Sequence, residues 1–251
     1  MQRYFISASN WSSDENIIIA GDDVHHIVRV MRMKEGDKII CNQSGGKAAT
    51  CEISHIENDQ VIASVVEWRN EIVELPIHVT IAQGLPKGDK LELIFQKGTE
   101  LGASAFIPFQ ADRSIVKWDK KKAGKKIERF VKIVKEASEQ AHRTVIPSVD
   151  TVLEFQKLLE KSKSFDVKLF AYEEEARTEH FKRLSDALTE LKTGQSLLVC
   201  IGPEGGFSDK EVSALKDAGF SSVRLGPRIL RTETAAMYLL SSISYHFEEL
   251  R

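Results

Sequence analysis

The chain has 251 residues, a formal charge of -2 at pH 7, 42% hydrophobic residues and 29% charged residues. This composition is near the globular average and argues against a disordered chain. The small net charge argues against a protein that coats nucleic acid through bulk charge, but it does not exclude a local basic patch. No apolar run approaches the roughly 20 residues that span a bilayer, so we expect no membrane segment.

The cysteines and the N-terminus indicate a reducing compartment. Cys41, Cys51 and Cys200 lie in apolar, strand-like sequence without CxxC spacing. We therefore expect buried free thiols, as in a cytoplasmic protein, and the N-terminus lacks the apolar core of a signal peptide. Seven scattered histidines without a paired Cys/His signature argue against a structural zinc site, and we expect no metal.

Residues 1–72 consist mainly of short segments rich in Ile and Val, separated by turn signals such as Gly45-Gly46. The expected strands cover residues 3–6, 16–20, 37–42, 47–54 and 60–68. One helix, capped by Asp23 and continuing through Met33, interrupts them. Many short strands with a single helix predict a small β-barrel.

From residue 73 to residue 251 strands alternate with helices, and Pro76 suits a short linker between the two domains. A helix opens at Asp89 with one apolar face, and a long polar helix covers about 120–142. The apolar face comprises Leu91, Ile94, Phe95 and Leu101, and the strands cover 77–84, 104–109, 166–172, 196–202 and 221–226. This alternation predicts an α/β domain with a mostly parallel sheet covered on both faces.

The basic residues are concentrated in one segment. Between Arg113 and Arg143 there are eleven basic and four acidic residues, a net charge of +7, which leaves -9 for the rest of the chain. A long charged run is most often a solvated helix face, but this run has one sign and is flanked by Trp118 and Phe130. A contact with a phosphate backbone is at least as good an interpretation.

The segment LLVCIGPEGGFSDKEV, residues 197–212, joins a buried strand to a helix through a glycine-rich turn. Ser208 and Glu211 have the spacing of a capping box, so the helix begins there. Neither GxxxxGK[ST] nor GxGxxG is present, which leaves a tight structural turn and a ligand loop about equally supported by this segment alone.

A second glycine-rich turn lies in LGPRILRTETAA, residues 225–236. A strand ends at Gly226-Pro227, two arginines follow, and Thr232 can cap a helix that begins with small residues. The simple alternative is ordinary capping beside surface arginines. Two Gly-Pro loops at the ends of nearby strands favour one composite pocket.

These two segments together resemble the bacterial 16S rRNA (uracil-N3)-methyltransferases of the trefoil-knotted SPOUT superfamily. Three more stretches match that family: HHIVRVMRMKEGD at 25–37, QKGTELGASAFIPF at 96–109 and EASEQAHRTVIP at 136–147. The resemblance covers essentially the whole chain. It implies a C-terminal SPOUT methyltransferase domain that ends in a knot and a small N-terminal PUA-like β-barrel that binds RNA.

The resemblance also implies S-adenosyl-L-methionine (SAM) as cofactor and a homodimer whose active site lies near the subunit interface. Its substrate would be 16S rRNA, in the assembled 30S subunit rather than as naked RNA. The residues at the matching cofactor positions are Leu198, Ile201, Gly202, Pro203, Glu204, Gly205, Gly206, Leu225, Gly226, Ile229, Leu230, Thr234 and Ala235.

Methylation at uridine N3 sets chemical demands. N3 lies on the Watson–Crick edge, so the base must be unpaired or flipped out. The N3 proton must leave, and negative charge that spreads onto O2 and O4 must be stabilised. Arg231 is the first candidate for contact with the uracil oxygens or a phosphate, and Glu233 and Glu204 are candidates for orientation or proton removal. A salt bridge is the plain alternative for each, and solvent can also take the proton.

Other basic residues suit RNA docking: Arg3, Arg29, Arg32, Lys34, Arg113, Lys117 and Arg143. Glu139 and Arg143 are further candidates for the active site, whereas His25 and His26 fit packing or surface roles better than catalysis. Two other functions stay open: a methyltransferase of the same superfamily that acts elsewhere on RNA, and a non-catalytic RNA-binding assembly factor. A test of SAM binding distinguishes the assembly factor from the two enzymes, because an intact cofactor pocket should bind SAM.

Overall fold

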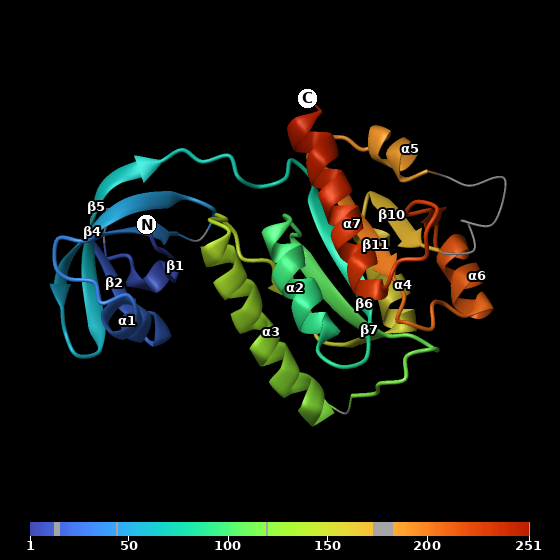
Figure 1. The fold of residues 1–251 in the computed structure, drawn as a ribbon, viewed down its shortest axis with the longest axis horizontal. Helices are drawn as coiled ribbons and strands as arrows, with labels where there is room; N and C mark the ends of the chain where they lie inside the picture. The colour runs from blue at the N-terminus through green and yellow to red at the C-terminus, as the bar shows by residue number, and fades with distance from the viewer. Residues whose placement is uncertain (13–15, 44, 119, 173–182, 251) are drawn as a thin grey trace. The chain divides into compact units, whose positions relative to one another are not determined.

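The computed structural model describes residues 1–12, 16–43, 45–118, 120–172 and 183–250 (Figure 1). They divide into two compact units. Unit 1 comprises Met1–Glu74 and Ser138–Val145, and unit 2 comprises Leu75–Ala137 and Ile146–Arg251. The sequence places the boundary after residue 72 and gives no sign that residues 138–145 belong with the N-terminal unit. No helix in the described ranges is long and apolar enough to cross a membrane.

Unit 1 is built on a five-stranded sheet in the order β1-β3-β4-β5-β2. Strand β1 pairs with β3 in parallel, and the other pairs are antiparallel. Register shifts along β4 and β5 bend the sheet around a core that includes Tyr4, Ile27 and Ile53. The strands are β1 (Arg3–Phe5), β2 (Asn16–Ala20), β3 (Lys38–Asn42), β4 (Ala48–Ile56) and β5 (Gln60–Arg69), close to the five predicted segments.

The helix of unit 1 differs from the prediction. It consists of α1 (Asp22–His25) and a π-helical turn, His26–Val30, after a 3-10 turn at Ala8–Asn10 earlier in the unit. Gly21, with φ 75°, precedes α1, so the prediction that Asp23 caps the helix is wrong. The predicted extension to Met33 is also wrong, because Arg32 has φ 54° and leaves the helical region.

Unit 2 contains a seven-stranded sheet in which every pair is parallel, in agreement with the prediction. The order is β12-β10-β11-β6-β7-β8, and β9 pairs with β7. The strands are β6 (His78–Gly84), β7 (Ala105–Gln110), β8 (Ser148–Val149), β9 (Leu153–Glu154), β10 (Val167–Ala171), β11 (Ser196–Ile201) and β12 (Ser221–Val223).

Helices cover both faces of this sheet. Alternate strand residues point to opposite faces, and the buried apolar residues on each face pack against helices. Val79 and Ile81 belong to a core cluster with side chains of α2, α3, α5 and α7, whereas Ala82 belongs to a cluster with side chains of α4 and α6. The helices are α2 (Lys90–Glu100), α3 (Lys120–Gln140), α4 (Phe155–Lys161), α5 (Leu184–Thr189), α6 (Asp209–Asp217) and α7 (Thr232–Ser244). A 3-10 turn, Ser162–Ser164, follows α4, and a π-helical turn, Tyr245–Glu249, follows α7.

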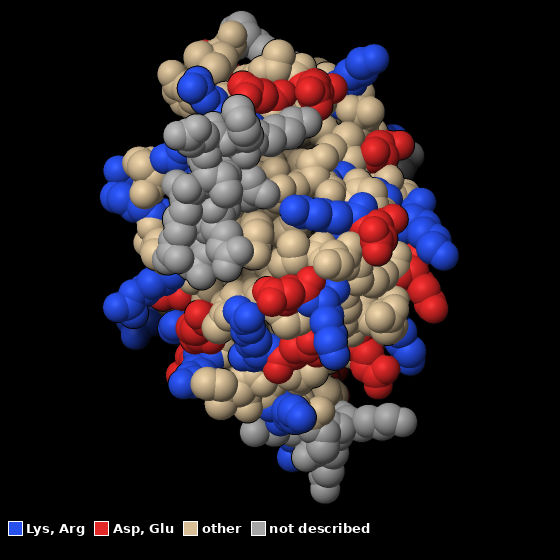
Figure 2. Space-filling view, turned by 90° about the vertical axis from the view of Figure 1, so that its right-hand side faces the viewer, with Lys and Arg blue, Asp and Glu red and all other residues tan. Residues whose placement is uncertain are grey.

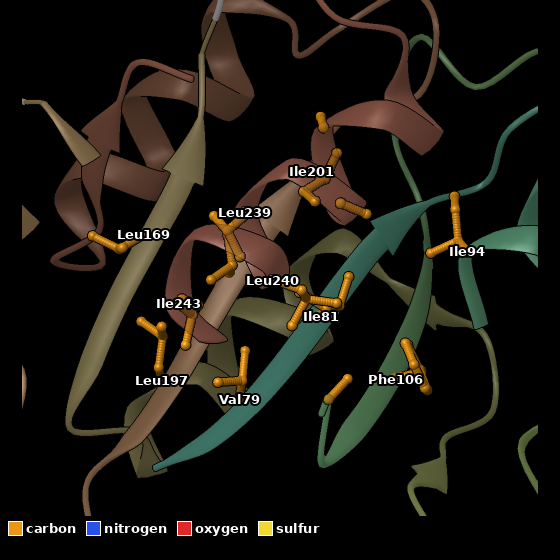
Figure 3. Close-up of a cluster of buried hydrophobic side chains, with 14 of the residues drawn as sticks. Val79, Ile81, Ile94, Phe106, Leu169, Leu197, Ile201, Leu239, Leu240 and Ile243 are labelled. Atoms are coloured by element: carbon orange, nitrogen blue, oxygen red, sulfur yellow. The ribbon is translucent and has the colours of Figure 1, made fainter. Parts of the chain in front are cut away.

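The apolar face of α7 belongs to the core. In Figure 3, Leu239, Leu240 and Ile243 of this helix face Val79, Ile81 and Leu197 of strands β6 and β11. All six side chains are at most 1% exposed. Burial of each such side chain stabilises the fold by roughly 1.5–3 kcal/mol. These residues are therefore unavailable as an exposed contact surface.

One further expectation is met in the described residues. Cys41, Cys51 and Cys200 are buried and free. The face shown in Figure 2 carries lysines and arginines interspersed with aspartates and glutamates, without a large area of one sign. In the basic run, Lys126 Nζ lies 5.0 Å from the centre of the Trp118 ring. The side chains of residues 119–122, which the run includes, lie outside the described part.

Candidate functional site

Strands β10, β11 and β12 are parallel neighbours, so their carboxyl ends meet at one edge of the sheet. A cavity of about 380 Å³ opens at this edge, in the range of small-molecule sites. Its walls come from the glycine loop (residues 202–207, after β11), the arginine loop (residues 224–231, after β12) and Tyr172 after β10. The composite pocket inferred from the two loops is therefore present in the structure.

The glycine loop folds tightly against the end of β6. A Cβ atom on Gly84 would lie 2.7 Å from Pro203 Cδ, and one on Gly202 would lie 3.1 Å from the carbonyl carbon of Gly206. Gly206 has φ 66° and donates its N–H to Pro203 O at 2.9 Å. Gly84 and Gly202 leave room for the close approach of the neighbouring segments, whereas the positive φ at Gly206 favours glycine. The loop thereby exposes backbone groups to the cavity.

The predicted capping box at the start of α6 is confirmed. Ser208 Oγ accepts from the Glu211 N–H at 3.3 Å, and Glu211 Oε2 accepts from the Ser208 N–H at 2.8 Å. The other carboxylate oxygen of Glu211 accepts from the Asp112 N–H at 2.9 Å. This cap therefore also anchors residues 111–114 beside the glycine loop.

A buried glutamine that the sequence did not single out joins the two halves of the cavity. Gln83 is fully buried at the end of β6, and its Nε2 donates to Thr232 Oγ1 at 2.8 Å. Thr232 Oγ1 donates in turn to Gly202 O at 2.7 Å. Thr232 was predicted to cap α7, but Arg231 is the N-cap residue and the Thr232 hydroxyl binds the glycine loop instead. A polar residue in the apolar pattern of residues 77–84 was the available signal.

The two candidate acids contact a lysine. Lys90 Nζ lies 2.8 Å from Glu204 Oε1 and 3.5 Å from Glu233 Oε2. Burial pushes the pKa of Glu204 upward, but hydrogen bonds from Lys90 and from the Lys87 N–H outweigh it, so this pKa is lowered. The hydrogen bond to Glu204 raises the pKa of Lys90. Glu204 therefore has the loop-fixing salt bridge that was its plain alternative, and a carboxylate of lowered pKa is a weak proton acceptor.

Basic side chains surround the cavity: Lys90, Arg113, Arg224, Arg228 and Arg231. Arg224 Nε donates to Gly226 O at 2.9 Å and shapes the arginine loop, whereas Arg228 and Arg231 are exposed. Between them Ile229 is 66% exposed. An apolar side chain flanked by exposed arginines suits a base and its phosphates.

Ten of the thirteen residues proposed to bind the cofactor line the cavity: Ile201, Gly202, Pro203, Glu204, Gly206, Leu225, Gly226, Ile229, Leu230 and Ala235. Gly205, Thr234 and Leu198 do not. Leu198 points to the opposite face of the sheet, where it packs with Phe170 and Phe207, because it is an odd number of residues from Ile201. Sequence reasoning missed Tyr172, Phe207 and Lys90 among the lining residues.

The residues proposed to bind RNA fall into three environments. Arg29, Arg32, Lys34 and Lys117 are exposed. Arg113 lines the cavity and donates to Gly205 O at 3.2 Å, so its place is beside the glycine loop.

Arg3 and Arg143 are buried in unit 1, and the expectation of RNA-docking side chains there conflicts with their burial. Arg3 donates to Asn42 Oδ1 at 3.0 Å and to Glu71 Oε2 at 2.6 Å. Arg143 pairs with Glu74 at 2.5 Å. Their guanidinium groups are used to hold unit 1 together, because a buried charge needs partners.

The remaining candidates lie in unit 1 as well. His26 Nδ1 lies 3.0 Å from the Tyr4 hydroxyl, which gives it a packing role, and His25 is exposed. Glu139 has one carboxylate oxygen buried, and it lies in the segment that joins unit 1. No group of three or more potential metal ligands occurs within the part of the chain that the structure describes.

Comparison with known proteins gives the class. Residues 73–244 match the model of the RNA methyltransferase domain, and residues 19–66 match that of the RNA methyltransferase PUA domain. The chain therefore belongs to the RNA methyltransferase family. Its fold is a SPOUT methyltransferase domain with a PUA-like N-terminal unit. The knot stays a prediction.

The chain is also similar to individual proteins over nearly its whole length. The chain is 53% identical to the ribosomal RNA small subunit methyltransferase E of Bacillus subtilis, over 100% of this chain and 99% of that protein. It is 34% identical to the protein of the same name from Mycobacterium bovis, over 90% and 85% of the two chains. The crystal structure of that methyltransferase from Neisseria gonorrhoeae, bound to S-adenosyl methionine, has a TM-score of 0.85 and 28% identity, with 97% of each chain covered.

Proposed function

We propose that this protein transfers a methyl group from SAM to N3 of a uridine in the 16S rRNA of the small ribosomal subunit. The observation that carries the proposal is the cavity that the two loops form at the carboxyl ends of β10–β12. The B. subtilis relative, named as a small subunit ribosomal RNA methyltransferase, supports the substrate class, and the SAM-bound N. gonorrhoeae structure supports the cofactor. The N3 position rests on the motif resemblance. An rRNA substrate fits a cytoplasmic protein, and the family favours a homodimer that acts on assembled 30S subunits.

The residues of the cavity fit SAM. Apolar side chains of Ile201, Leu225 and Leu230 offer surface for a planar base, and the glycine loop offers backbone groups for polar contacts. Gly226, with φ 85°, keeps the loop free of a side chain at its turn. SAM supplies an electrophilic methyl group on a positively charged sulfur.

The side chains of this protein then act on the uridine. Arg231, exposed at the N-cap of α7, stabilises negative charge on the uracil oxygens, and Arg228 binds a neighbouring phosphate. Glu204 is held by Lys90 and has a lowered pKa, so we assign the N3 proton to solvent rather than to this carboxylate. Glu233 orients the start of α7 through Lys90.

Calorimetry with SAM and a methyl-transfer assay on 30S subunits test this function. The wild-type protein should bind SAM and label 16S rRNA, and mass mapping should place the methyl group on N3 of a uridine. A Gly84→Val variant, whose side chain would collide with Pro203, should lose SAM affinity by about tenfold or more. Absence of SAM binding by the wild-type protein contradicts the proposal.

A further inference from the structure

Lys90 joins three segments of the cavity wall that are far apart in the sequence. It is the first residue of α2, Glu204 belongs to the glycine loop, and Glu233 lies in the first turn of α7. The ammonium group donates to Glu204 Oε1 at 2.8 Å and lies 3.5 Å from Glu233 Oε2. It is therefore the one positive charge shared by both carboxylates in the contacts of the described residues.

These three side chains are partly shielded from water, so the interactions between their charges are screened less than at a fully exposed surface. The side chains of Lys90, Glu204 and Glu233 are 28%, 32% and 15% exposed. Glu233 Oε2 is buried and accepts no hydrogen bond within the described residues. Without the ammonium group, the carboxylates would lose their common counter-ion and repel each other.

Glu204 is also tied to the segment before α2. Its Oε1 and Oε2 accept from the Lys87 N–H at 3.1 and 3.4 Å. The glycine loop is thus held at its Glu204 position by residues 87–90, while Gln83 holds it at Gly202. Both supports also reach α7: Gln83 contacts it at Thr232, and Lys90 contacts it at Glu233 and carries the positive charge.

We propose that Lys90 is a positioning residue, whose ammonium group holds the glycine loop and the start of α7 in the arrangement that binds SAM. This inference rests on the proposed function of the cavity. Lys90 does not act as a proton acceptor, because its hydrogen bond to Glu204 keeps it protonated. The two glutamates serve as its anchors.

Four variants test this role: K90M, K90R, the double variant K90M/E204Q and the control K97M. Lys97 is on the same helix, pairs with Glu100 and does not line the cavity. In the ligand-free protein, K90M should speed hydrogen exchange of residues 202–207 and 232–236 by about tenfold. K90R should stay within about threefold of wild type, and K97M should leave exchange unchanged.

SAM affinity provides the second measurement. At pH 8, K90M should weaken binding by about tenfold, because Glu204 and Glu233 then lose their shared counter-ion. The loss should shrink as the pH falls far enough for Glu204 to become protonated, and it should shrink in K90M/E204Q at pH 8. A merely space-filling lysine predicts neither the recovery at low pH nor the relief by E204Q.

Three results would overturn the proposal: unchanged exchange and affinity in K90M, an equal loss in K90R although the charge is retained, or a loss that neither low pH nor E204Q relieves. Failure of the proposed function gives a different pattern. If the wild-type protein binds no SAM, that function is wrong, whereas the exchange measurement still decides whether Lys90 holds the two segments.

Discussion

Arginines of the two units have opposite surroundings. In unit 1 the side chains of Arg3 and Arg143 are 1% and 5% exposed, and each pairs with a glutamate. In unit 2 Arg228 and Arg231 line the cavity and are exposed. A buried guanidinium group that pairs with a carboxylate is out of reach of a ligand, whereas an exposed group beside a cavity can donate to one.

This difference in exposure distinguishes arginines that stabilise the fold from arginines that are available to contact a substrate. Both kinds looked alike in the sequence, where Arg3, Arg143 and Arg231 were all candidates for contact with RNA. Substitution of the buried arginines should change stability, and substitution of the exposed arginines should change activity. Each prediction below tests one side of this division.

The largest effect is expected for Arg231→Ala. Loss of one charged donor at the site of developing negative charge should lower kcat/KM by about 100-fold or more. The melting temperature should stay near the wild-type value, because Arg231 is exposed. Methyl-transfer assays with thermal unfolding check this, and near-normal turnover would remove Arg231 from the mechanism.

On the other side, Arg143→Met should destabilise unit 1. It leaves Glu74, whose side chain is 27% exposed, without its ion-pair partner. Removal of one partner of a buried pair typically costs about 3–5 kcal/mol. Denaturant unfolding of the full chain measures the change, and an unfolding free energy within about 0.5 kcal/mol of wild type would show that the pair contributes little.

Acid should weaken unit 1 through the same pairs. Burial pushes the pKa of Glu74 upward, but hydrogen bonds and charge from Arg143 lower it below the ordinary value of 4.5. The pKa of Glu71 is likewise lowered, by Arg69 and Arg3 against the effect of burial. Carboxyl groups with lowered pKa stabilise the fold above their unfolded pKa, and this stability is lost as the pH falls through the folded value.

Thermal unfolding between pH 7 and pH 3 checks that sign. Stability should be retained above about pH 4.5 and decline below it, and Arg143→Met should show a smaller decline than wild type. Equal pH dependence in both proteins would mean that Glu74 does not carry the effect.

The smallest effect is expected on the exposed surface of unit 1. A triple variant with Arg29, Arg32 and Lys34 changed to alanine should weaken RNA binding and reduce the salt slope by about 2 to 3. SAM affinity should be unchanged, since these side chains are not part of the cavity. RNA titrations at several salt concentrations check this, and an unchanged slope would exclude phosphate contacts at all three positions.

Much of the fold followed from periodicity. The strands of unit 1, the five longer strands of unit 2 and the capping box at Ser208 lie close to where their patterns predicted them, whereas the two-residue strands β8 and β9 were not predicted. The helix after β2 differs from its prediction, because Gly21 and Arg32 adopt positive φ angles that a hydrophobic pattern does not encode. The return of Ser138–Val145 to unit 1 depends on contacts such as Asn42 Nδ2 to Arg143 O, across 101 residues of sequence.

The candidate site could also be predicted in part from the sequence. The two Gly-Pro loops indicated a composite pocket, and the family resemblance supplied the ten lining residues that were named in advance. Lys90, Gln83 and Thr232 act through long-range hydrogen bonds, which local sequence does not reveal. Charge alone also failed to distinguish Arg3, which is buried, from Arg231, which is exposed.

The proposed activity is transfer of a methyl group to uridine N3 in 16S rRNA at this cavity. Mass mapping of the RNA tests it most directly. Mass mapping of 16S rRNA is carried out on a deletion strain complemented with the wild-type gene or with Arg231→Ala. One N3-methyluridine should be absent from the deletion strain, return with the wild-type protein and stay absent with the variant. Persistence of every methylated uridine in the deletion strain would contradict the claim.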